Sequence, residues 1–442
     1  MPASADTIYA LSSGALPAGV AVIRISGPQA FLALTTLTGR EIPSPRRAVL
    51  SSIRDRNDEI IDQALILAFP APNSFTGENC VEIHSHGSRA VLASVFAELE
   101  NLEGFRPADA GEFSRRAFEN GKMDLLEVEG LADLLQAETE MQRRLAVEQS
   151  TGKLSALYDG WAGRLTRARA LIEAELDFAD EDDVPDSVAT QVWEAMSQLR
   201  GEIDDHLRQG NGGEIIRDGF KVALVGEPNA GKSTLLNALS GRDVAIVTDI
   251  AGTTRDVLSV DINLDGYLVR IFDTAGIRET EDVVEQEGVR RAKLTAENAD
   301  LILLLQDNDS PPKQSFISFG NARHLYLRTK SALSTDSAEN AFDLSISAKE
   351  GHGLDELRAV ITQEIRNRVG TGQTLVPARA RHKKRLEETL NYVSDALDSE
   401  AMDLAIRSEY LRLAATSLGR ITGRVDVEDL LGVIFSEFCI GK

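Results

Sequence analysis

The chain has 442 residues and a formal net charge of -23. This length is too great for one ordinary hydrophobic core and predicts about two to four domains. The excess of acidic residues disfavours a polyphosphate as the main ligand, because like charges repel. No run of roughly 20 apolar residues is present and the N-terminus lacks the layout of a secretion signal, so we expect a cytoplasmic protein without a membrane span. The two cysteines, Cys80 and Cys439, cannot build a disulfide framework or a cysteine-rich zinc site.

Residues 1–118 mix short β-rich runs with turn residues. The runs are Val20–Ile25, Glu59–Ala68 and Cys80–His84, and the turns include Gly27-Pro28 and the segment 70–73. Such a mixture predicts strands joined by turns. We therefore expect a small α+β domain here.

Two kinds of pattern fill the rest of the chain. Leu, Ala, Glu and Arg recur at helical spacing from about Asn120 to Gly210 and again after Pro377, which predicts a helical bundle. Between them, apolar runs of strand length alternate with helical patterns, which predicts a parallel sheet covered by helices. These runs are Val222–Val225, Leu268–Phe272, Leu301–Leu305 and His324–Leu327. The economical interpretation is a discontinuous all-α domain, residues 119–216 plus 377–442, with an α/β domain inserted at residues 217–376.

A phosphate-binding motif begins the inserted domain. The buried-strand pattern Lys221–Val225 is followed by GEPNAGKS at residues 226–233 and then by the helix-like run Thr234–Leu239. This is GxxxxGKS between a strand and a helix, as a P-loop requires. Lys232 would neutralise the β- and γ-phosphates and Ser233 would offer its hydroxyl to Mg²⁺. A chance glycine-rich turn is disfavoured, since the strand, the helix, Lys and Ser are all in place.

Two further segments have the spacing that nucleotide hydrolysis needs. Asp273 directly follows a strand and precedes Thr274-Ala275-Gly276, so its carboxylate would lie beside the metal and a glycine N–H beside the γ-phosphate. The segment Gly252–Asp256 lies between the two motifs in a polar loop, where Thr254 would complete the Mg²⁺ shell of Ser233 and Asp273. Taken alone, this loop is interpreted equally well as a plain turn.

The motif that reads the nucleotide base is altered. GTPases of this class usually read guanine with Asn-Lys-x-Asp, whose carboxylate accepts two hydrogen bonds from the base. Residues 329–332 are Thr, Lys, Ser and Ala, so Lys330 can stack on the base but Ala332 offers no carboxylate. A missing acceptor leaves donors of the base unpaired. Ser347-Ala348-Lys349 would give a second base contact through its backbone.

Three groups of basic residues are candidate RNA contacts. They are Arg115 and Arg116; Arg143 and Arg144; and the cluster Arg379, Arg381, His382, Lys383, Lys384 and Arg385. An ordinary solvated helix face is the more economical interpretation of each group.

Several stretches, most of them outside the P-loop motifs, carry a resemblance to a known family. They are VIRISG at 22–27, PNSFTGE at 72–78, GEFSRRAF at 111–118, VTDIAGTTRD at 247–256 and FCIGK at 438–442. With the order of the domains, they make the chain resemble the tRNA modification GTPases of the MnmE (TrmE) family along its whole length. The resemblance implies a GTP hydrolase that acts on tRNA.

The resemblance also implies a folate cofactor and protein partners. The N-terminal domains would form a homodimer, each binding 5-formyltetrahydrofolate at Arg24, Glu82, Lys122 and Lys442. Cations suit the carboxylates of folate and a carboxylate suits its pterin ring, although the residues alone indicate ordinary surface charges. The FAD protein MnmG would complete a heterotetramer that adds an aminomethyl or carboxymethylaminomethyl group at C5 of the wobble uridine, position 34, of tRNA.

The resemblance also implies that the G domain is activated by potassium and hydrolyses GTP when two G domains meet face to face. Matching K⁺ positions are Asn229, Thr248, Ile250 and Thr253, whose oxygens are hard ligands. Matching catalytic positions are Lys232, Arg255 and Glu285, of which Glu285 would position the attacking water, and Cys439 is a candidate nucleophile. From the residues alone, Glu285 is a solvated charge and Cys439 a small apolar side chain. The predicted nucleotide-binding residues are Asn229, Ala230, Gly231, Lys232, Ser233, Thr234, Thr248, Thr253, Thr254, Asp273, Thr274, Ala275, Gly276, Lys330, Ser347, Ala348 and Lys349.

Two other interpretations stay open. A ribosome-assembly switch would need a dedicated RNA-binding module such as a KH domain, and none is evident in the sequence. A degenerate regulatory G domain would explain Thr329 and Ala332, but the intact Lys232, Ser233 and Asp273 disfavour it.

Overall fold

A computed structural model describes most of the chain. The described residues are 6–177, 187–227, 229–241, 245–246, 259–273, 297–306, 322–329, 342–370, 375–398, 403–425, 431–432, 434–435, 438 and 441. The chain forms two compact units. The first comprises Met1–Ala132, Gln149–Ala162 and Leu418–Lys442, and the second comprises Asp133–Glu148 and Gly163–Ser417. None of the helices in the described ranges is long and apolar enough to cross a membrane.

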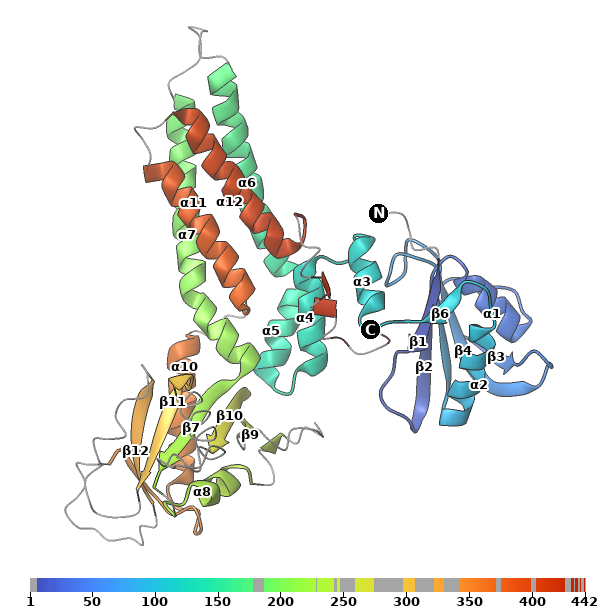
Figure 1. The fold of residues 1–442 in the computed structure, drawn as a ribbon, viewed down its shortest axis with the longest axis horizontal. Coiled ribbons are helices and arrows are strands. Elements are labelled where there is room, and N and C mark those ends of the chain that lie inside the picture. The colour runs from blue at the N-terminus through green and yellow to red at the C-terminus, as the bar shows by residue number, and fades with distance from the viewer. Residues whose placement is uncertain are drawn as a thin grey trace, which may run out of the picture. The chain divides into compact units, whose positions relative to one another are not determined.

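The first unit contains a six-stranded sheet with the strand order β3-β4-β5-β2-β1-β6. The strands are β1 (Thr7–Leu11), β2 (Ala18–Ser26), β3 (Val49–Arg54), β4 (Ile60–Phe69), β5 (Cys80–Gly87) and β6 (Phe105–Pro107). Alternate residues such as Ile23, Ile66 and Ile83 are buried and form one core with the helices α1 (Ala30–Thr38) and α2 (Arg89–Glu100). The predicted α+β character of this region therefore comes from a sheet with helices on one face (Figure 1).

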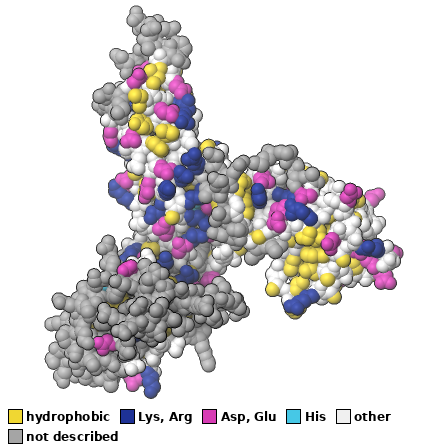
Figure 2. Space-filling view, viewed as in Figure 1, with side chains coloured by type: hydrophobic (Ala, Val, Ile, Leu, Met, Phe, Trp, Pro, Cys, Tyr) yellow, Lys and Arg dark blue, Asp and Glu magenta, His cyan; other side chains and the backbone are white. Residues whose placement is uncertain are grey.

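The opposite face of this sheet carries exposed apolar side chains. In the register of the sheet, Leu50 of β3 is paired with Leu65 of β4, and both are exposed. Val20 of β2 is exposed as well. Figure 2 shows hydrophobic side chains gathered on the surface where Figure 1 draws β1 and β2. An apolar patch of this kind on a sheet is typical of a protein–protein contact.

Near the end of β1, a short helix and the C-terminal residues complete the first unit. Helix α3 (Glu112–Glu119) places Phe113 against Ile8 and Ala10 of β1. The C-terminal residues Leu431, Ile434, Phe435 and Phe438 pack with residues of α4 (Leu125–Gln136). At Gly111 (φ +68°), an added Cβ would lie 2.5 Å from the carbonyl oxygen of Phe435, so this close approach requires glycine.

Long helices occupy the segments where helical spacing predicts them. They are α5 (Glu140–Ser150), α6 (Lys153–Asp177), α7 (Ser187–Asp218), α11 (Ala380–Asp398) and α12 (Leu404–Thr422). Within the second unit, α7 packs on α11. Gly213 of α7 approaches the segment before α11 closely, because an added Cβ would lie 2.7 Å from the carbonyl oxygen of Pro377. Two helices that are far apart in sequence, α7 and α11, therefore lie against each other.

The second unit also contains a seven-stranded sheet with the order β13-β12-β11-β7-β10-β9-β8. The strands are β7 (Phe220–Gly226), β8 (Ala245–Ile246), β9 (Ser259–Leu264), β10 (Tyr267–Asp273), β11 (Leu301–Gln306), β12 (Arg323–Thr329) and β13 (Leu344–Ile346). Helices α8 (Lys232–Leu239) and α10 (Leu354–Val369) contribute Leu235, Leu239 and Ile361 to its core. The carboxyl ends of β7, β10, β11, β12 and β13 therefore share one edge of the sheet.

The four strands that the sequence predicted, β7, β10, β11 and β12, run parallel, but the sheet also has an antiparallel side that was not predicted. Strand β9 runs antiparallel to β10, and β8 runs antiparallel to β9. Asp265 (φ +52°) and Gly266 (φ +85°) form the two-residue turn between β9 and β10. Positive φ at both positions matches the twist of an antiparallel hairpin, and Asp-Gly is the sequence signal for it.

Candidate functional site

The P-loop lies at the carboxyl edge of the sheet, between β7 and α8. Asn229 (φ +65°) and Gly231 (φ +92°) take left-handed backbone conformations that turn the chain into the helix. Helix α8 begins at Lys232, where the N–H of Leu235 donates to the carbonyl oxygen of Gly231 at 2.8 Å. The N-terminus of a helix and a turn of this kind favour an anion because unpaired N–H groups point toward it.

The ammonium group of Lys232 is held inside this loop. It donates hydrogen bonds to the carbonyl oxygens of Gly226 at 2.8 Å and Glu227 at 3.0 Å, and the residue is 8% exposed. Burial lowers the pKa of Lys232 and the charge of Asp273 opposes this effect. The partners that accept from the ammonium are thus neutral carbonyls. Phosphate oxygens would be stronger partners for the same charge.

Ser233 and Asp273 meet where a metal ion is expected. The Ser233 hydroxyl donates to Oδ2 of Asp273 at 3.0 Å, although the two residues lie on α8 and β10. Oδ1 of Asp273 is buried and has no hydrogen-bond partner among the described residues. A hydroxyl and a carboxylate with a spare oxygen fit Mg²⁺, which is usually held by few protein ligands and by phosphate oxygens. The donor set therefore suits a magnesium–nucleotide complex.

The predicted base-binding residues lie along the same edge. Thr329 ends β12 and pairs with Ile346 of β13, so Ser347 directly follows a neighbouring strand end. The Thr329 hydroxyl donates to the carbonyl oxygen of Ala230 in the P-loop at 2.7 Å. Thr234, in the first turn of α8, is exposed. The structure therefore brings together Asn229, Ala230, Gly231, Lys232, Ser233, Thr234, Asp273, Ser347, Ala348 and Lys349 at the carboxyl ends of the strands.

The other predicted residues of this domain lie outside the described ranges. They are Thr248, Ile250, Thr253, Thr254, Arg255, Thr274, Ala275, Gly276, Glu285 and Lys330. The same holds for Cys439 and Lys442 at the C-terminus. Their assigned roles stay predictions.

A second group of predicted residues lies in the N-terminal sheet. Arg24 of β2 and Glu82 of β5 form an ion pair, with Nη2 and Oε1 separated by 2.9 Å and side chains 18% and 20% exposed. The guanidinium of Arg24 lies 4.9 Å from the ring centre of Phe75 and 5.7 Å from that of Phe113. Lys122 donates from Nζ to the carbonyl oxygen of Pro72 at 3.1 Å, in the loop that carries Phe75. The structure thus gathers these charges around the segment 72–78.

The C-terminal end reaches the N-terminal sheet within the same unit. The Ser12 hydroxyl donates to the carbonyl oxygen of Gly441 at 2.7 Å. At Gly441 (φ +96°) an added Cβ would lie 2.1 Å from the carbonyl oxygen of Leu11, so the contact requires glycine. The residue before the predicted folate ligand Lys442 is therefore fixed beside the loop that joins β1 to β2.

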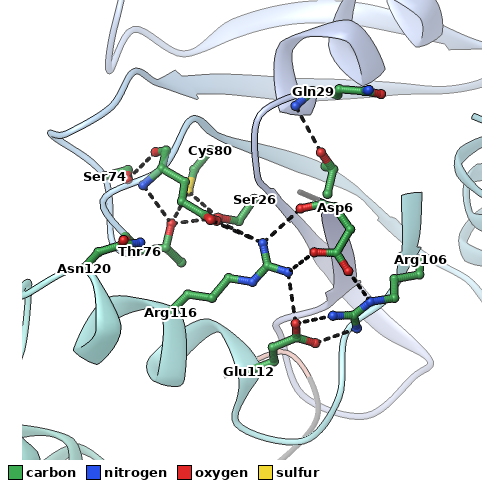
Figure 3. Close-up of polar contacts among 12 residues, drawn as sticks. Asp6, Ser26, Gln29, Ser74, Thr76, Cys80, Arg106, Glu112, Arg116 and Asn120 are labelled. Carbon is green, nitrogen blue, oxygen red and sulfur yellow. Dashed lines mark hydrogen bonds and ion pairs between the residues drawn. The ribbon is translucent and has the colours of Figure 1, made fainter. Parts of the chain in front are cut away.

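The N-terminal domain also contains a buried network of charges, which the sequence did not indicate (Figure 3). Arg116 of α3 is 3% exposed and donates to Asp6 Oδ1 at 2.8 Å, to Glu112 Oε1 at 3.0 Å and to Glu78 at 3.3 Å. Arg106 donates to Glu112 Oε2 at 2.8 Å and also pairs with Asp6. Burial acts to raise the pKa of Glu112, but hydrogen bonds from Arg106 and Arg116 and the Asp109 N–H outweigh it and lower the pKa.

This network joins two of the segments that carry the family resemblance. Glu78 belongs to the segment 72–78, and Arg116 belongs to the segment 111–118. Glu78 also accepts a hydrogen bond from the Ser26 hydroxyl at 2.7 Å, and Asn120 donates to the carbonyl oxygen of Thr76 at 2.8 Å (Figure 3). The network therefore holds the loop that supports Arg24 against α3.

Most of the candidate RNA-binding cations are paired with carboxylates. Arg143 and Arg144 both contact Glu140 at 2.8 Å, and Arg115 contacts Glu119 at 3.0 Å. In the last group, Arg379 contacts Asp133, Lys383 contacts Glu214, and Arg385 contacts Glu388, whereas His382 is fully buried. These contacts favour the interpretation of a solvated helix face for Arg115, Arg143 and Arg144. That interpretation is wrong for Arg116 and His382, which are buried.

A cavity of 770 Å³ lies elsewhere in the second unit. It is bordered by the segment 133–145, the end of α7 and the strands β9 and β10, and the ion pairs Asp133–Arg217 and Asp261–Arg270 line it. None of the predicted site residues is among the described residues that line it. We therefore do not assign the nucleotide to this cavity.

These features define a P-loop nucleotide-binding protein. The GxxxxGKS motif follows a strand, a helix starts at its lysine, and its serine contacts an aspartate on the neighbouring strand of the sheet. Residues 7–122 match the family described as "GTP-binding protein TrmE N-terminus", and residues 125–439 match the "MnmE helical domain". The chain therefore belongs to the MnmE family of tRNA modification GTPases. The predicted enzyme class, a GTP hydrolase, and the predicted fold class are confirmed: an α+β N-terminal domain, a helical domain and a P-loop GTPase domain.

Relatives along the whole chain agree with this assignment. The tRNA modification GTPase MnmE of Agrobacterium fabrum strain C58 is 84% identical over 442 residues, which is 100% of both chains. The protein of the same name from Rhizobium johnstonii is 58% identical and covers 99% of both chains. A comparison with solved structures also finds a tyrosine-to-alanine variant of Aquifex aeolicus Era bound to GDP·AlF4⁻, at 28% identity and a TM-score of 0.28, over 39% of this chain and 66% of that one; no argument rests on this match.

Proposed function

We propose that this protein hydrolyses GTP and uses the reaction in modification of tRNA at the wobble uridine. The observation that carries the proposal is the contact of Ser233 with Asp273 beside the buried ammonium of Lys232. Membership of the MnmE family and the name of the relative at 84% identity support the choice of GTP and tRNA. The product would carry an aminomethyl or carboxymethylaminomethyl group at C5 of the uridine at position 34.

The described residues suggest how the chain would bind the triphosphate. Lys232 would exchange its contacts with two carbonyl oxygens for phosphate oxygens, which pair better with an ammonium group. Ser233 and Asp273 would hold Mg²⁺, which neutralises charge on the phosphates. Asn229, Thr248, Ile250 and Thr253 would hold K⁺, Thr254 would join the Mg²⁺ shell, and Arg255 and Glu285 would act in the switch segments. These last assignments rest on the family resemblance.

The N-terminal site would bind 5-formyltetrahydrofolate. Arg24 and Glu82 offer a cation and a carboxylate that are both partly exposed, and Phe75 and Phe113 flank the guanidinium, so the group fits a flat, polar ring. Lys122 and Lys442 would add cations for the glutamate tail. Bound folate supplies a one-carbon unit, and Cys439 is proposed as a nucleophile beside it on resemblance alone.

We propose the division into residues 1–118, 119–216 plus 377–442, and 217–376 for the three domains. A homodimer through the N-terminal domains is supported by the exposed apolar side chains on their sheet, Val20, Leu50 and Leu65. The FAD protein MnmG is the proposed partner in a heterotetramer, and the cytoplasm is the proposed compartment. These assignments follow the family.

Nucleoside analysis of tRNA tests the proposal directly. Deletion of the gene should remove the modified wobble uridine, and the wild-type chain should restore it. Ser233→Ala should fail to restore it, whereas Ser240→Ala should restore it, because Ser240 lies at the far end of the same helix and its hydroxyl donates to Asn237. An unchanged nucleoside profile after deletion would contradict the proposal.

A further inference from the structure

The loop that joins α1 to β3 carries an exposed group of arginines. Residues 39–48 contain Arg40, Arg46 and Arg47 and a single acidic residue, Glu41. All three arginines are exposed. Among the described residues, none of the three forms an ion pair with a carboxylate. In a chain with a net charge of -23, this loop is therefore a local excess of positive charge.

Two hydrogen bonds attach this loop to β4 and to the segment after it, and a third closes a turn within the loop. The N–H of Arg46 donates to the carbonyl oxygen of Ala68 in β4 at 3.0 Å, and its guanidinium donates from Nη2 to the carbonyl oxygen of Asn73 at 3.1 Å. The N–H of Arg47 donates to the carbonyl oxygen of Ser44 at 3.2 Å. The backbone of the loop is therefore fixed where it carries these two arginines.

A lysine from a different part of the chain reaches the same segment. Lys122 donates from Nζ to the carbonyl oxygen of Pro72 at 3.1 Å, next to the Asn73 oxygen that accepts from Arg46. Because consecutive residues lie about 3.8 Å apart, the two cationic groups lie within roughly 15 Å of each other. Both have neutral carbonyl oxygens as partners, and phosphate oxygens would be stronger acceptors for the same charges. We call the loop 39–48 and Lys122 the basic surface.

The groups of cations on the helices differ from the basic surface, because carboxylates already balance them. Arg143 and Arg144 share Glu140. Arg115 pairs with Glu119. An arginine without a carboxylate partner keeps its charge available for an anion from outside, and its planar group fits phosphate. The basic surface is therefore a better candidate for contact with RNA than these helix faces.

The basic surface borders the proposed folate site. The segment 70–73 leads to Phe75, whose ring centre lies 4.9 Å from the guanidinium carbon of Arg24. Arg24 in turn pairs with Glu82. In the proposed reaction, folate supplies the carbon that reaches C5 of the wobble uridine, so the RNA around that uridine must approach Arg24 and Glu82. The phosphates of neighbouring nucleotides would then face the basic surface.

We propose that the basic surface binds the phosphate backbone of the anticodon stem-loop of tRNA. Arg46 and Arg47 would each hold a phosphate group, and Arg40 and Lys122 would add to the local positive potential. Contacts of this kind fix the register of the RNA and read no base. The inference rests on the proposed function, because tRNA is the substrate of the proposed reaction.

The test measures the dissociation constant of the full-length protein for an unmodified tRNA transcript with uridine at position 34, at a series of KCl concentrations. Arg46→Gln/Arg47→Gln should weaken binding by about tenfold and lower the slope of log Kd against log[KCl] by about 1.5, because two phosphate contacts are lost. Arg56→Gln is the matched control, since Arg56 is exposed but pairs with Glu98 and lies beyond the other end of β3. Unchanged affinity and slope in the double variant would overturn the inference.

A second transcript separates phosphate contacts from recognition of the base. The double variant should weaken binding of a tRNA with guanosine at position 34 by the same factor, because phosphate contacts are indifferent to the base. A loss confined to the transcript with uridine would assign Arg46 and Arg47 to base recognition and overturn the inference. Loss of the modified uridine in cells without any change in Kd for tRNA would show that the surface holds a protein partner, and would overturn the inference as well.

Two further readouts keep the inference separate from the proposed function. The double variant should retain GTP turnover and affinity for 5-formyltetrahydrofolate, because Arg46 and Arg47 lie outside the G domain and contact neither Arg24 nor Glu82. Retention of both also shows that the variant is folded. Weakened tRNA binding, together with a nucleoside profile that gene deletion leaves unchanged, would support the RNA surface and reject wobble modification as the function. Absence of tRNA binding by the wild-type protein, with GTP turnover retained, would overturn the inference and leave GTP hydrolysis standing.

Discussion

The two charged sites of this chain differ in how their charges are balanced. In the G domain, Lys232 donates to carbonyl oxygens and Asp273 keeps a buried oxygen without a partner among the described residues. In the N-terminal domain, the buried Arg116 is surrounded by the carboxylates of Asp6, Glu78 and Glu112. An unbalanced buried charge is costly unless a ligand completes it, whereas a balanced network stabilises the fold. The comparison therefore separates a site built for a ligand from a site built for structure.

Removal of a charge from the balanced network should have the largest effect. Arg116→Ala leaves three carboxylates without their shared partner and should lower the free energy of unfolding of this region by about 3–5 kcal/mol. Arg115→Ala is the matched control, because its pair with Glu119 is exposed and contributes about 0.5 kcal/mol. Denaturant unfolding of the full chain, with amide hydrogen exchange in residues 105–120, would measure both. Equal effects of the two variants would contradict a structural role for the network.

Removal of a charge from the unbalanced site should affect turnover instead. Asp273→Asn should lower kcat for GTP by about 10²–10³-fold, because the carboxylate that holds the metal is lost. Asp265→Asn, in the turn before β10, should leave kcat unchanged since that carboxylate pairs with Arg366 at the surface. Steady-state GTP hydrolysis with excess Mg²⁺ measures both variants. Retained turnover in Asp273→Asn would remove Asp273 from the metal site.

The pair formed by Arg24 and Glu82 is intermediate, because it is balanced and yet partly exposed. Arg24→Ala should weaken binding of 5-formyltetrahydrofolate by about tenfold or more, the value of one lost charge-assisted hydrogen bond, and leave GTP turnover intact. Arg54→Ala, on the edge strand β3, is the control. Isothermal titration with folate would decide the matter: unchanged affinity in Arg24→Ala would place the folate elsewhere.

A change of pH should have a smaller effect on the stability of the N-terminal network. The pKa of Glu112 is held below its ordinary value of 4.5, since hydrogen bonds from Arg106 and Arg116 outweigh burial. Its contribution to stability is therefore complete above pH 4.5 and is lost as the pH falls through the lower pKa of the folded state. Amide exchange in residues 105–120 should become faster below about pH 4.5, and Glu112→Gln should flatten this dependence. The same slope in Glu112→Gln would assign the dependence to other carboxylates.

The P-loop could be predicted from the sequence because its chemistry is contiguous. Gly226 ends β7, and Lys232 and Ser233 begin α8 a few residues later, so the backbone of one short loop fixes their relation. Asp273 could also be predicted, because parallel strands end at the same edge of a sheet and Asp273 ends the strand next to β7. The antiparallel strand β9 was not predicted, although Asp265-Gly266 is a hairpin signal.

The N-terminal network could not be predicted in the same way. Asp6, Glu78, Arg106 and Arg116 come from four separated segments, and only the packing of α3 on the sheet brings them together. In the sequence, each reads as an ordinary surface charge. Arg24 and Glu82 were predicted through the family resemblance. Their pairing across the strands β2 and β5 is known only from the structure. Local patterns thus predict chemistry that is local in sequence.

The most direct test of GTP hydrolysis at the P-loop compares K⁺ with Na⁺ as the only monovalent cation. The purified protein should hydrolyse GTP much faster in K⁺, and Ser233→Ala should abolish this turnover while Ser240→Ala keeps it. Turnover that is the same in both cations would withdraw the proposed roles of Asn229 and the first switch. Turnover that survives in Ser233→Ala would contradict the assignment of the site itself.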